Sequence, residues 1–255
     1  MFLGKICRIM NGMKKKIIFI VPLALLVIGA GVWFSVKTKE ARIGDYRGEP
    51  IEEIGNDPAI KNFPPAAVEQ GKNRLKELAA LLEKDPQNWN FWMEVGQLKK
   101  FFNNYNGAVA AYEYVKTNNP EDPLVYYNLA NLYGSYLGDY PKAEEYYLKA
   151  VSYGPNEEYI YLGFAEFYRD FYKAKYDQIE NLLLEGLKNV PNYTNLLIQL
   201  AYYYKSVYGE SHRTIDKENA IKYFSQLLNA QDVGAAQKQA FREEIKVLYS
   251  EPAEL

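Results

Sequence analysis

The amino-acid sequence predicts an all-α protein: a right-handed α-solenoid of about four helix-turn-helix repeats with capping helices, preceded by one transmembrane helix. Two observations predict the repeats. One pattern of aromatic and small residues recurs along most of the chain, and Pro86, Pro120, Pro155 and Pro191 follow one another at intervals of 34, 35 and 36 residues. A period in this range is typical of stacked two-helix units. A third observation predicts the membrane span: the residues from Ile17 to Val36 carry no charge.

The N-terminal part is expected to anchor the protein in a membrane. A helix of about 20 residues spans roughly 30 Å, the thickness of the hydrocarbon core. Residues 1–16 carry five Lys and Arg, and residues 37–42 carry three. Because the more basic flank stays inside, we expect 1–16 to be a basic cytoplasmic N-terminus, 17–36 to be a signal anchor, and the repeats to lie outside a bacterial cytoplasmic membrane. The alternative is a cleaved signal peptide and a secreted protein.

Residues 37–70 are expected to form a linker. Prolines and glycines interrupt any continuous helix there, at Pro50, Pro58, Pro64, Pro65, Gly44, Gly48 and Gly55. We therefore predict a spacer that holds the repeats away from the membrane. An N-terminal capping helix is expected within 71–88, where the run from Arg74 to Lys84 is strongly helical in character.

Four predicted repeat units follow, over residues 89–122, 123–157, 158–193 and 194–233. In the first, Trp92, Val95, Gly96 and Lys99 stand at i, i+3, i+4 and i+7, which places them on one face of a helix. The matching residues of the later units are Tyr126, Leu129 and Ala130, then Tyr161, Phe164 and Ala165, then Leu197, Leu200 and Ala201. Each proline is expected to end a second helix. Residues 234–255 are expected to form a C-terminal capping helix and tail.

This pattern resembles the tetratricopeptide repeat family over roughly residues 71–249. The resemblance implies antiparallel helix pairs that cross closely at small residues. These are Gly96, Ala130, Ala165 and Ala201 on the first helices and Ala108, Ala143 and Ala220 on the second. Ile179 departs from the pattern, so the third pair is expected to be splayed or repacked. The fourth unit carries an insertion, Tyr208–Lys217, which is expected to extend its first helix or to form a protruding loop.

The sequence offers few residues for catalysis. His212 is the only histidine and Cys7 the only cysteine, so neither a His-based metal cluster nor an ordinary Ser/His/Asp triad can be assembled. The phosphate-binding pattern GxxxxGK and the dinucleotide pattern GxGxxG are missing from the sequence. Residues 43–255 carry 22 basic and 31 acidic groups, which disfavours nucleic acid as a partner. We expect no enzymatic activity, no cofactor and no metal.

The sequence favours a non-enzymatic scaffold that binds a protein or peptide partner. In the tetratricopeptide repeat family the first helices line a concave groove. Carried over by register, the candidate partner-binding residues are Met93, Gln97, Lys100, Tyr127, Asn131, Leu162, Glu166, Arg169, Ile198, Tyr202 and Lys205. Such a surface suits an extended peptide or a helix. Two alternatives stay open: a self-assembling, homo-oligomeric structural subunit of an envelope complex, and an accessory non-catalytic subunit of an enzyme.

Overall fold

The computed structural model describes residues 43–250, which form α-helices and short 3-10 and π segments without a β-strand. The all-α prediction is confirmed for this part of the chain. The chain divides into two compact units, residues 1–50 and 51–255. The described α-helices belong to the second unit and are α2 (Pro65–Lys84), α3 (Trp89–Phe101), α4 (Tyr105–Asn118), α5 (Pro123–Leu132), α6 (Tyr140–Tyr153), α7 (Glu158–Asp170), α8 (Ile179–Asn189), α9 (Thr194–Ser211), α10 (Thr214–Asn229) and α11 (Ala235–Ser250). The short segments are η1 (Pro58–Asn62), η2 (Tyr133–Leu137) and η3 (Lys173–Gln178).

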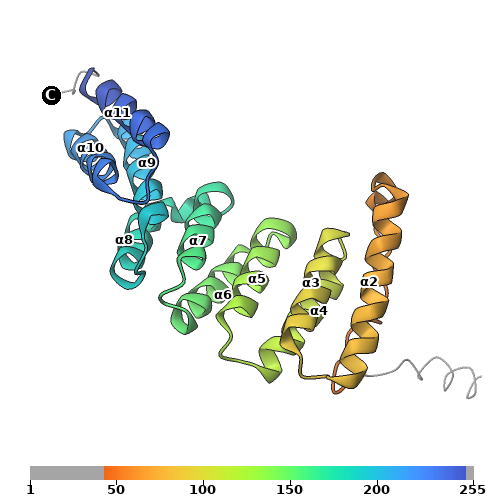
Figure 1. Ribbon diagram of the computed structural model, residues 1–255. Helices are drawn as coiled ribbons and strands as arrows, with labels where there is room; N and C mark the ends of the chain where they lie inside the picture. The colour runs from red at the N-terminus through yellow and green to blue at the C-terminus, as the bar shows by residue number, and fades with distance from the viewer. Residues whose placement is uncertain (1–42, 251–255) are drawn as a thin grey trace, which may run out of the picture. The chain divides into compact units, whose positions relative to one another are not determined.

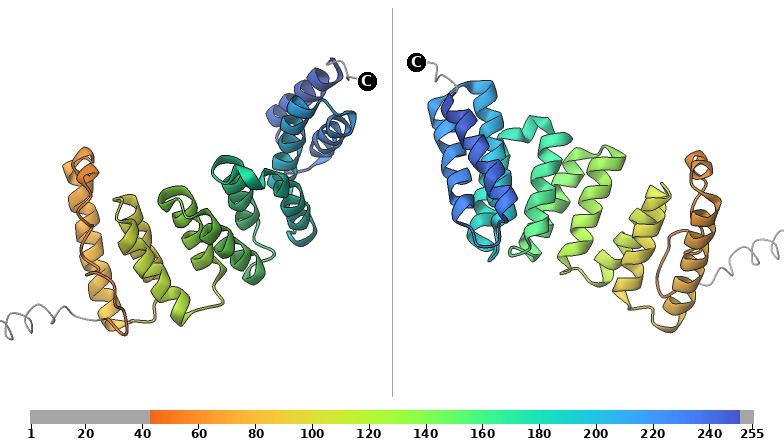
Figure 2. Two further views of the ribbon diagram at one scale, coloured as in Figure 1. Left: turned by 180° about the vertical axis from the view of Figure 1, so that it is seen from behind. Right: turned by 45° about the horizontal axis from the view of Figure 1, so that its top comes forward.

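Consecutive helices of the second unit pack as antiparallel pairs (Figures 1 and 2). The pairs are α3 with α4, α5 with α6, α7 with α8 and α9 with α10, and each of the four predicted repeat units encloses one pair. We call α3, α5, α7 and α9 the first helices of these pairs. Further contacts join α4 to α5, α6 to α7 and α8 to α9, while α2 packs against α3 and α11 against α10. Each helix therefore buries its apolar stripe against its neighbours in the chain.

A recurring hydrogen bond joins the proline of one loop to the aromatic residue of the helix that follows. The donors and acceptors are Trp92 Nε1 to the Pro86 carbonyl at 2.9 Å, Tyr126 Oη to the Pro120 carbonyl at 2.8 Å, and Tyr161 Oη to the Pro155 carbonyl at 2.9 Å. The bond fixes each loop against the start of the next first helix, which gives a physical reason for the regular spacing of these residues. The fourth unit has Pro191 and Leu197 in these places, and leucine has no donor.

Small residues allow the helices of a pair to cross closely. A Cβ atom added to Gly96 would lie 2.2 Å from the ring of Tyr112, and Ala108, Ala143 and Ala220 are fully buried. The third pair differs. Ile179 occupies the corresponding place, η3 separates α7 from α8, and the contact between these two helices is the least extensive of the four pairs. This agrees with the expectation of a splayed or repacked third pair.

Residues 51–64 pack on the helices instead of forming a free spacer. Ile51 and Ile54 are only 4% and 5% exposed. The buried Lys99 side chain of α3 donates a hydrogen bond from Nζ to the Glu53 carbonyl oxygen at 2.7 Å. The prediction of a spacer over 37–70 is therefore wrong for residues 51–64. The loss of helical periodicity predicts a spacer, but an irregular segment can be buried without such periodicity.

The capping helix at the front begins earlier than predicted. It was expected within 71–88, but α2 starts at Pro65, with Pro64 as its N-cap residue. Proline is well tolerated at the first position of a helix, because the N–H that it lacks would have no partner within the helix. The two prolines therefore mark a helix start, and not the interruption that the sequence predicts there.

The insertion in the fourth unit lengthens its first helix, which is one of the two expected outcomes. α9 continues to Ser211, and His212 ends it in the left-handed conformation, with φ of 52°. α11 occupies most of the predicted C-terminal segment, and residues 251–255 lie outside the described part.

The predicted basic N-terminus (1–16) and the predicted membrane span (17–36) also lie outside the described residues. Among the helices that the structure describes, none has both the length and the apolar content needed to cross a bilayer.

Candidate binding surface

The predicted partner-binding residues lie on the four first helices, which run in the same direction (Figures 1 and 2). All of them are exposed or half-buried except Met93. Met93 is 5% exposed, so it packs inside the protein and is not available as a contact residue. Leu162 of α7 and Ile198 of α9 are half-buried and stand apart from the rest. The others form three groups along the array, described below from the N-terminal end.

The N-terminal group is formed by Lys100 of α3 and Tyr136 of η2. The Lys100 Nζ atom lies 5.8 Å from the centroid of the Tyr136 ring, within reach of a cation–π interaction. Burial lowers the pKa of Lys100. Gln97, one turn earlier on α3, is exposed. This part of the surface therefore offers one amide, one cation and one phenol.

The middle group is formed by α5 and α7. Tyr127 meets Tyr159 edge to face, with 5.0 Å between ring centroids. A Cβ atom added to Gly163 would lie 2.6 Å from the Tyr127 ring, so the close approach of this ring to α7 requires glycine. Burial raises the pKa of Tyr127, and the carboxylate of Glu166 adds to the effect. Asn131, one turn after Tyr127 on α5, is half-buried. The packing of α5 on α7 thus brings Tyr127 close to Glu166, beside the half-buried ring of Tyr159.

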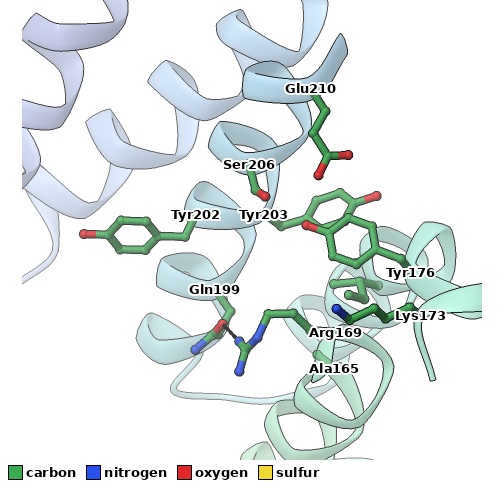
Figure 3. Close-up of a pocket in the computed structure, with 10 residues that line it drawn as sticks. Ala165, Arg169, Lys173, Tyr176, Gln199, Tyr202, Tyr203, Ser206 and Glu210 are labelled. Carbon is green, nitrogen blue, oxygen red and sulfur yellow. Dashed lines mark hydrogen bonds between the residues drawn. The ribbon is translucent and has the colours of Figure 1, made fainter. Parts of the chain in front are cut away.

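The C-terminal group surrounds a pocket of about 430 Å³ between α7, η3 and α9, which we call the α7–α9 pocket (Figure 3). Its polar and aromatic lining consists of Arg169, Lys173, Tyr176, Gln199, Tyr202, Tyr203, Ser206 and Glu210. Gln199, Tyr203, Ser206 and Glu210 of α9 are three or four positions apart, so they share one side of the helix. Ile179 also lines the pocket. The pocket therefore opens where the third helix pair is splayed.

Hydrogen bonds hold the Arg169 guanidinium at the floor of the pocket. Nε and Nη2 donate to the two carboxylate oxygens of Asp170 at 2.8 and 3.0 Å. Nη1 donates to Gln199 Oε1 at 3.3 Å (Figure 3). The bonds to Asp170 raise the pKa of Arg169 and lower that of Asp170. The carboxylate of Asp170 partly neutralises the Arg169 guanidinium. Arg169 is therefore better suited to donating hydrogen bonds than to attracting an anion from a distance.

Two phenol rings form the aromatic wall of the pocket. The ring centroids of Tyr176 and Tyr203 lie 5.4 Å apart. Burial, assisted by the carboxylate of Glu180, raises the pKa of Tyr203 to about 12. The phenol of Tyr203 is therefore neutral at physiological pH and can both donate and accept a hydrogen bond.

α11 limits the surface at its C-terminal end. Lys205 Nζ donates to Glu244 Oε2 of α11 at 2.5 Å. The Tyr202 ring points to the other side of α9 from Tyr203 and meets Phe224 edge to face, with 5.1 Å between centroids (Figure 3). Lys205 and Tyr202 are thus engaged by neighbouring helices, and this leaves Gln199, Tyr203 and Ser206 as the more accessible side of α9.

Sequence reasoning missed most of the pocket lining. Lys173 and Tyr176 stand on η3, a 3-10 segment without helical periodicity of its own. Gln199, Tyr203, Ser206 and Glu210 lie one position away from predicted residues or beyond them on α9. The only signal that could have indicated them was Ile179, which marks the splayed pair. No protein-family model matches the chain, and a comparison with curated proteins finds no match.

Proposed function

We propose that the described helices form a right-handed solenoid of tetratricopeptide-like repeats that binds a protein or peptide partner and has no enzymatic activity. The proposal is supported by the four antiparallel pairs, each with an aromatic residue and a small residue at matching places on its first helix, or a leucine and an alanine in the fourth. It is also supported by the recurrent bonds to the proline carbonyls. In such an array, consecutive first helices offer a continuous surface for a partner.

The observation that carries the binding proposal is the α7–α9 pocket. Side-chain amide, hydroxyl, guanidinium and phenol groups converge there beside aromatic rings (Figure 3). An extended peptide presents alternating carbonyl and N–H groups, which Gln199, Ser206 and Tyr203 can meet as both donors and acceptors. The rings of Tyr176 and Tyr203 offer a rigid surface to an apolar side chain of the same peptide.

The proposal includes an anchor at residues 17–36, with the N-terminus in the cytoplasm and the repeats outside the cytoplasmic membrane. The support for this part is the uncharged run and its basic flanks. Cleavage of the segment and secretion of the protein is the alternative. Protease protection of the full chain in spheroplasts separates the two: an anchored chain stays with the membrane and is cleaved from outside, whereas a secreted chain leaves the cells.

The binding proposal is tested by photocrosslinking in cells that express the full chain. A benzophenone amino acid replaces Ser206 at the pocket, and as a matched control it replaces Ser152, an exposed serine of α6. We expect a discrete adduct from position 206 that position 152 does not form and that Gln199→Ala weakens. The same set of adducts from both positions would refute the pocket as a partner site.

A further inference from the structure

A second pocket opens at the edge of the fourth helix pair, between the loop before α9 and the end of α10. Its volume is about 870 Å³, and Pro191, Tyr193 and Leu197 belong to its lining. We call it the α9–α10 edge pocket. It shares no residue with the α7–α9 pocket.

The location of this pocket coincides with the missing aromatic bond of the fourth unit. In the other three units the ring of Trp92, Tyr126 or Tyr161 occupies this place and donates to a proline carbonyl. Leu197 is smaller and has no donor. Within residues 43–250, no side-chain hydrogen bond is described to the Pro191 carbonyl oxygen. The fourth unit therefore keeps the acceptor and lacks the ring that would use it.

The surroundings of the pocket suit a phenol group. Side-chain amides dominate the polar lining, at Asn192, Gln226, Asn229 and Gln231. In the third unit a side-chain amide donates a hydrogen bond to the phenol oxygen of the first helix. The donor is Asn189 Nδ2, at the end of α8, and the acceptor is Tyr161 Oη at 3.1 Å. Asn229 has the comparable position at the end of α10.

An aromatic ring that donates to the Pro191 carbonyl oxygen has to come from outside the fourth unit. In the third unit Gly186 lies against the Tyr161 ring, whereas Leu227 is the matching residue of α10 and is fully buried. The larger leucine fills the inner part of the space, so only its outer part, next to Pro191, is open. A ring from another molecule could enter there without displacing Leu197.

We propose that the α9–α10 edge pocket binds a tyrosine side chain of a partner protein. The ring packs on Leu197 and beside Tyr193, the phenol O–H donates to the Pro191 carbonyl oxygen, and a side-chain amide such as Asn229 donates to the phenol oxygen. The inference goes beyond the proposed function, because it assigns a second site with its own ligand chemistry. It does not require that the α7–α9 pocket bind anything.

The test uses N-acetyl-L-tyrosinamide and N-acetyl-L-phenylalaninamide as probes of the full chain, followed by the NMR signals of its side-chain amides. We expect the tyrosine probe to shift signals of Asn192, Gln226 and Asn229. The phenylalanine probe should bind about threefold to tenfold more weakly, because it lacks one hydrogen bond. Equal affinities would overturn the proposal, and so would an absence of shifts at these amides.

Two variants establish the place of binding. Gln226→Trp, at an exposed position on the rim, should cover the pocket and abolish the shifts, whereas Gln237→Trp, at an exposed position of α11, should leave them unchanged. Binding that survives Gln226→Trp would overturn the assignment. If dilution of the protein alone moves the same signals, the occupant is a second copy of the chain and the assignment to a partner protein is wrong.

Discussion

Tyr168 Oη donates a hydrogen bond of 2.7 Å to Glu144 Oε1, and this bond joins the first helix of the third pair to the second helix of the second pair. The same arrangement recurs one unit later, where Tyr204 Oη donates to Glu180 Oε1 at 2.5 Å. Each glutamate directly follows the residue at the helix crossing, Ala143 or Ile179. The bond therefore connects neighbouring helix pairs at equivalent places, and we expect it to stabilise the stack.

Replacing Tyr168 by phenylalanine should destabilise the array while keeping the ring. A hydrogen bond to a charged acceptor contributes about 1.5–3 kcal/mol when buried, and because Glu144 is partly exposed we expect about 1–2 kcal/mol. The melting temperature of the full chain, measured by circular dichroism, should fall by roughly 3–6 °C. Tyr249→Phe, at a side chain that is 70% exposed, should have no effect. Equal melting temperatures for both variants would contradict the stabilising role.

Stability should decline in alkaline solution. Burial first, and the bond to Glu144 second, raise the pKa of Tyr168 well above the ordinary value of 10.0, and the pKa of Tyr204 is raised in the same direction. A group whose pKa is higher in the folded state binds its proton more tightly there, so its contribution to stability is complete below pH 10 and is lost as the pH rises above it. Melting temperatures measured from pH 8 to 11.5 should therefore fall above about pH 10, and less steeply in Tyr168→Phe/Tyr204→Phe. A double variant with the wild-type slope would exclude these two tyrosines as the cause.

Two glycines should respond to alanine in opposite directions. Gly96→Ala brings a Cβ atom within 2.2 Å of the Tyr112 ring. Overpacking of this kind costs about 1–3 kcal/mol and is only partly offset by the helix propensity of alanine. Gly209 of α9 has no neighbour within 4 Å of such an atom, so Gly209→Ala should increase the free energy of unfolding by roughly 0.5–1 kcal/mol. Urea unfolding of both variants tests the prediction, and a gain in stability for Gly96→Ala would refute the close crossing.

The segment 51–64 should behave as part of the folded unit. Ile54→Ala removes a side chain that is 5% exposed, and the loss of a buried isoleucine costs about 2 kcal/mol or more. The neighbouring Glu52 is exposed, so Glu52→Ala serves as a matched control without effect. The measurement is the urea midpoint of the full chain. Identical midpoints for both variants would restore the interpretation of this segment as a free spacer.

The helix pairs could be predicted from the sequence because their signals are local. The prolines end helices, and the residues from Trp92 to Lys99 show helical spacing on one face. The packing of residues 51–64 could not be predicted, because Glu53 meets Lys99 through a backbone carbonyl, which any residue type would supply. The α7–α9 pocket could not be predicted either. Its residues on η3 reach the pocket because the third helix pair is splayed at Ile179, and the sequence pattern does not describe that packing. Register alone places Met93 on the surface, whereas its burial depends on how the neighbouring helices pack.

The central claim, that a partner protein binds at the α7–α9 pocket, is tested most directly by affinity. The partner segment captured from position 206 is synthesised, and its binding to the full chain is measured by calorimetry. We predict that Tyr203→Ala weakens binding at least tenfold, as expected for an aromatic residue at the centre of a contact, and that Tyr249→Ala leaves it unchanged. Equal affinities of wild-type protein and Tyr203→Ala for this segment would contradict the claim.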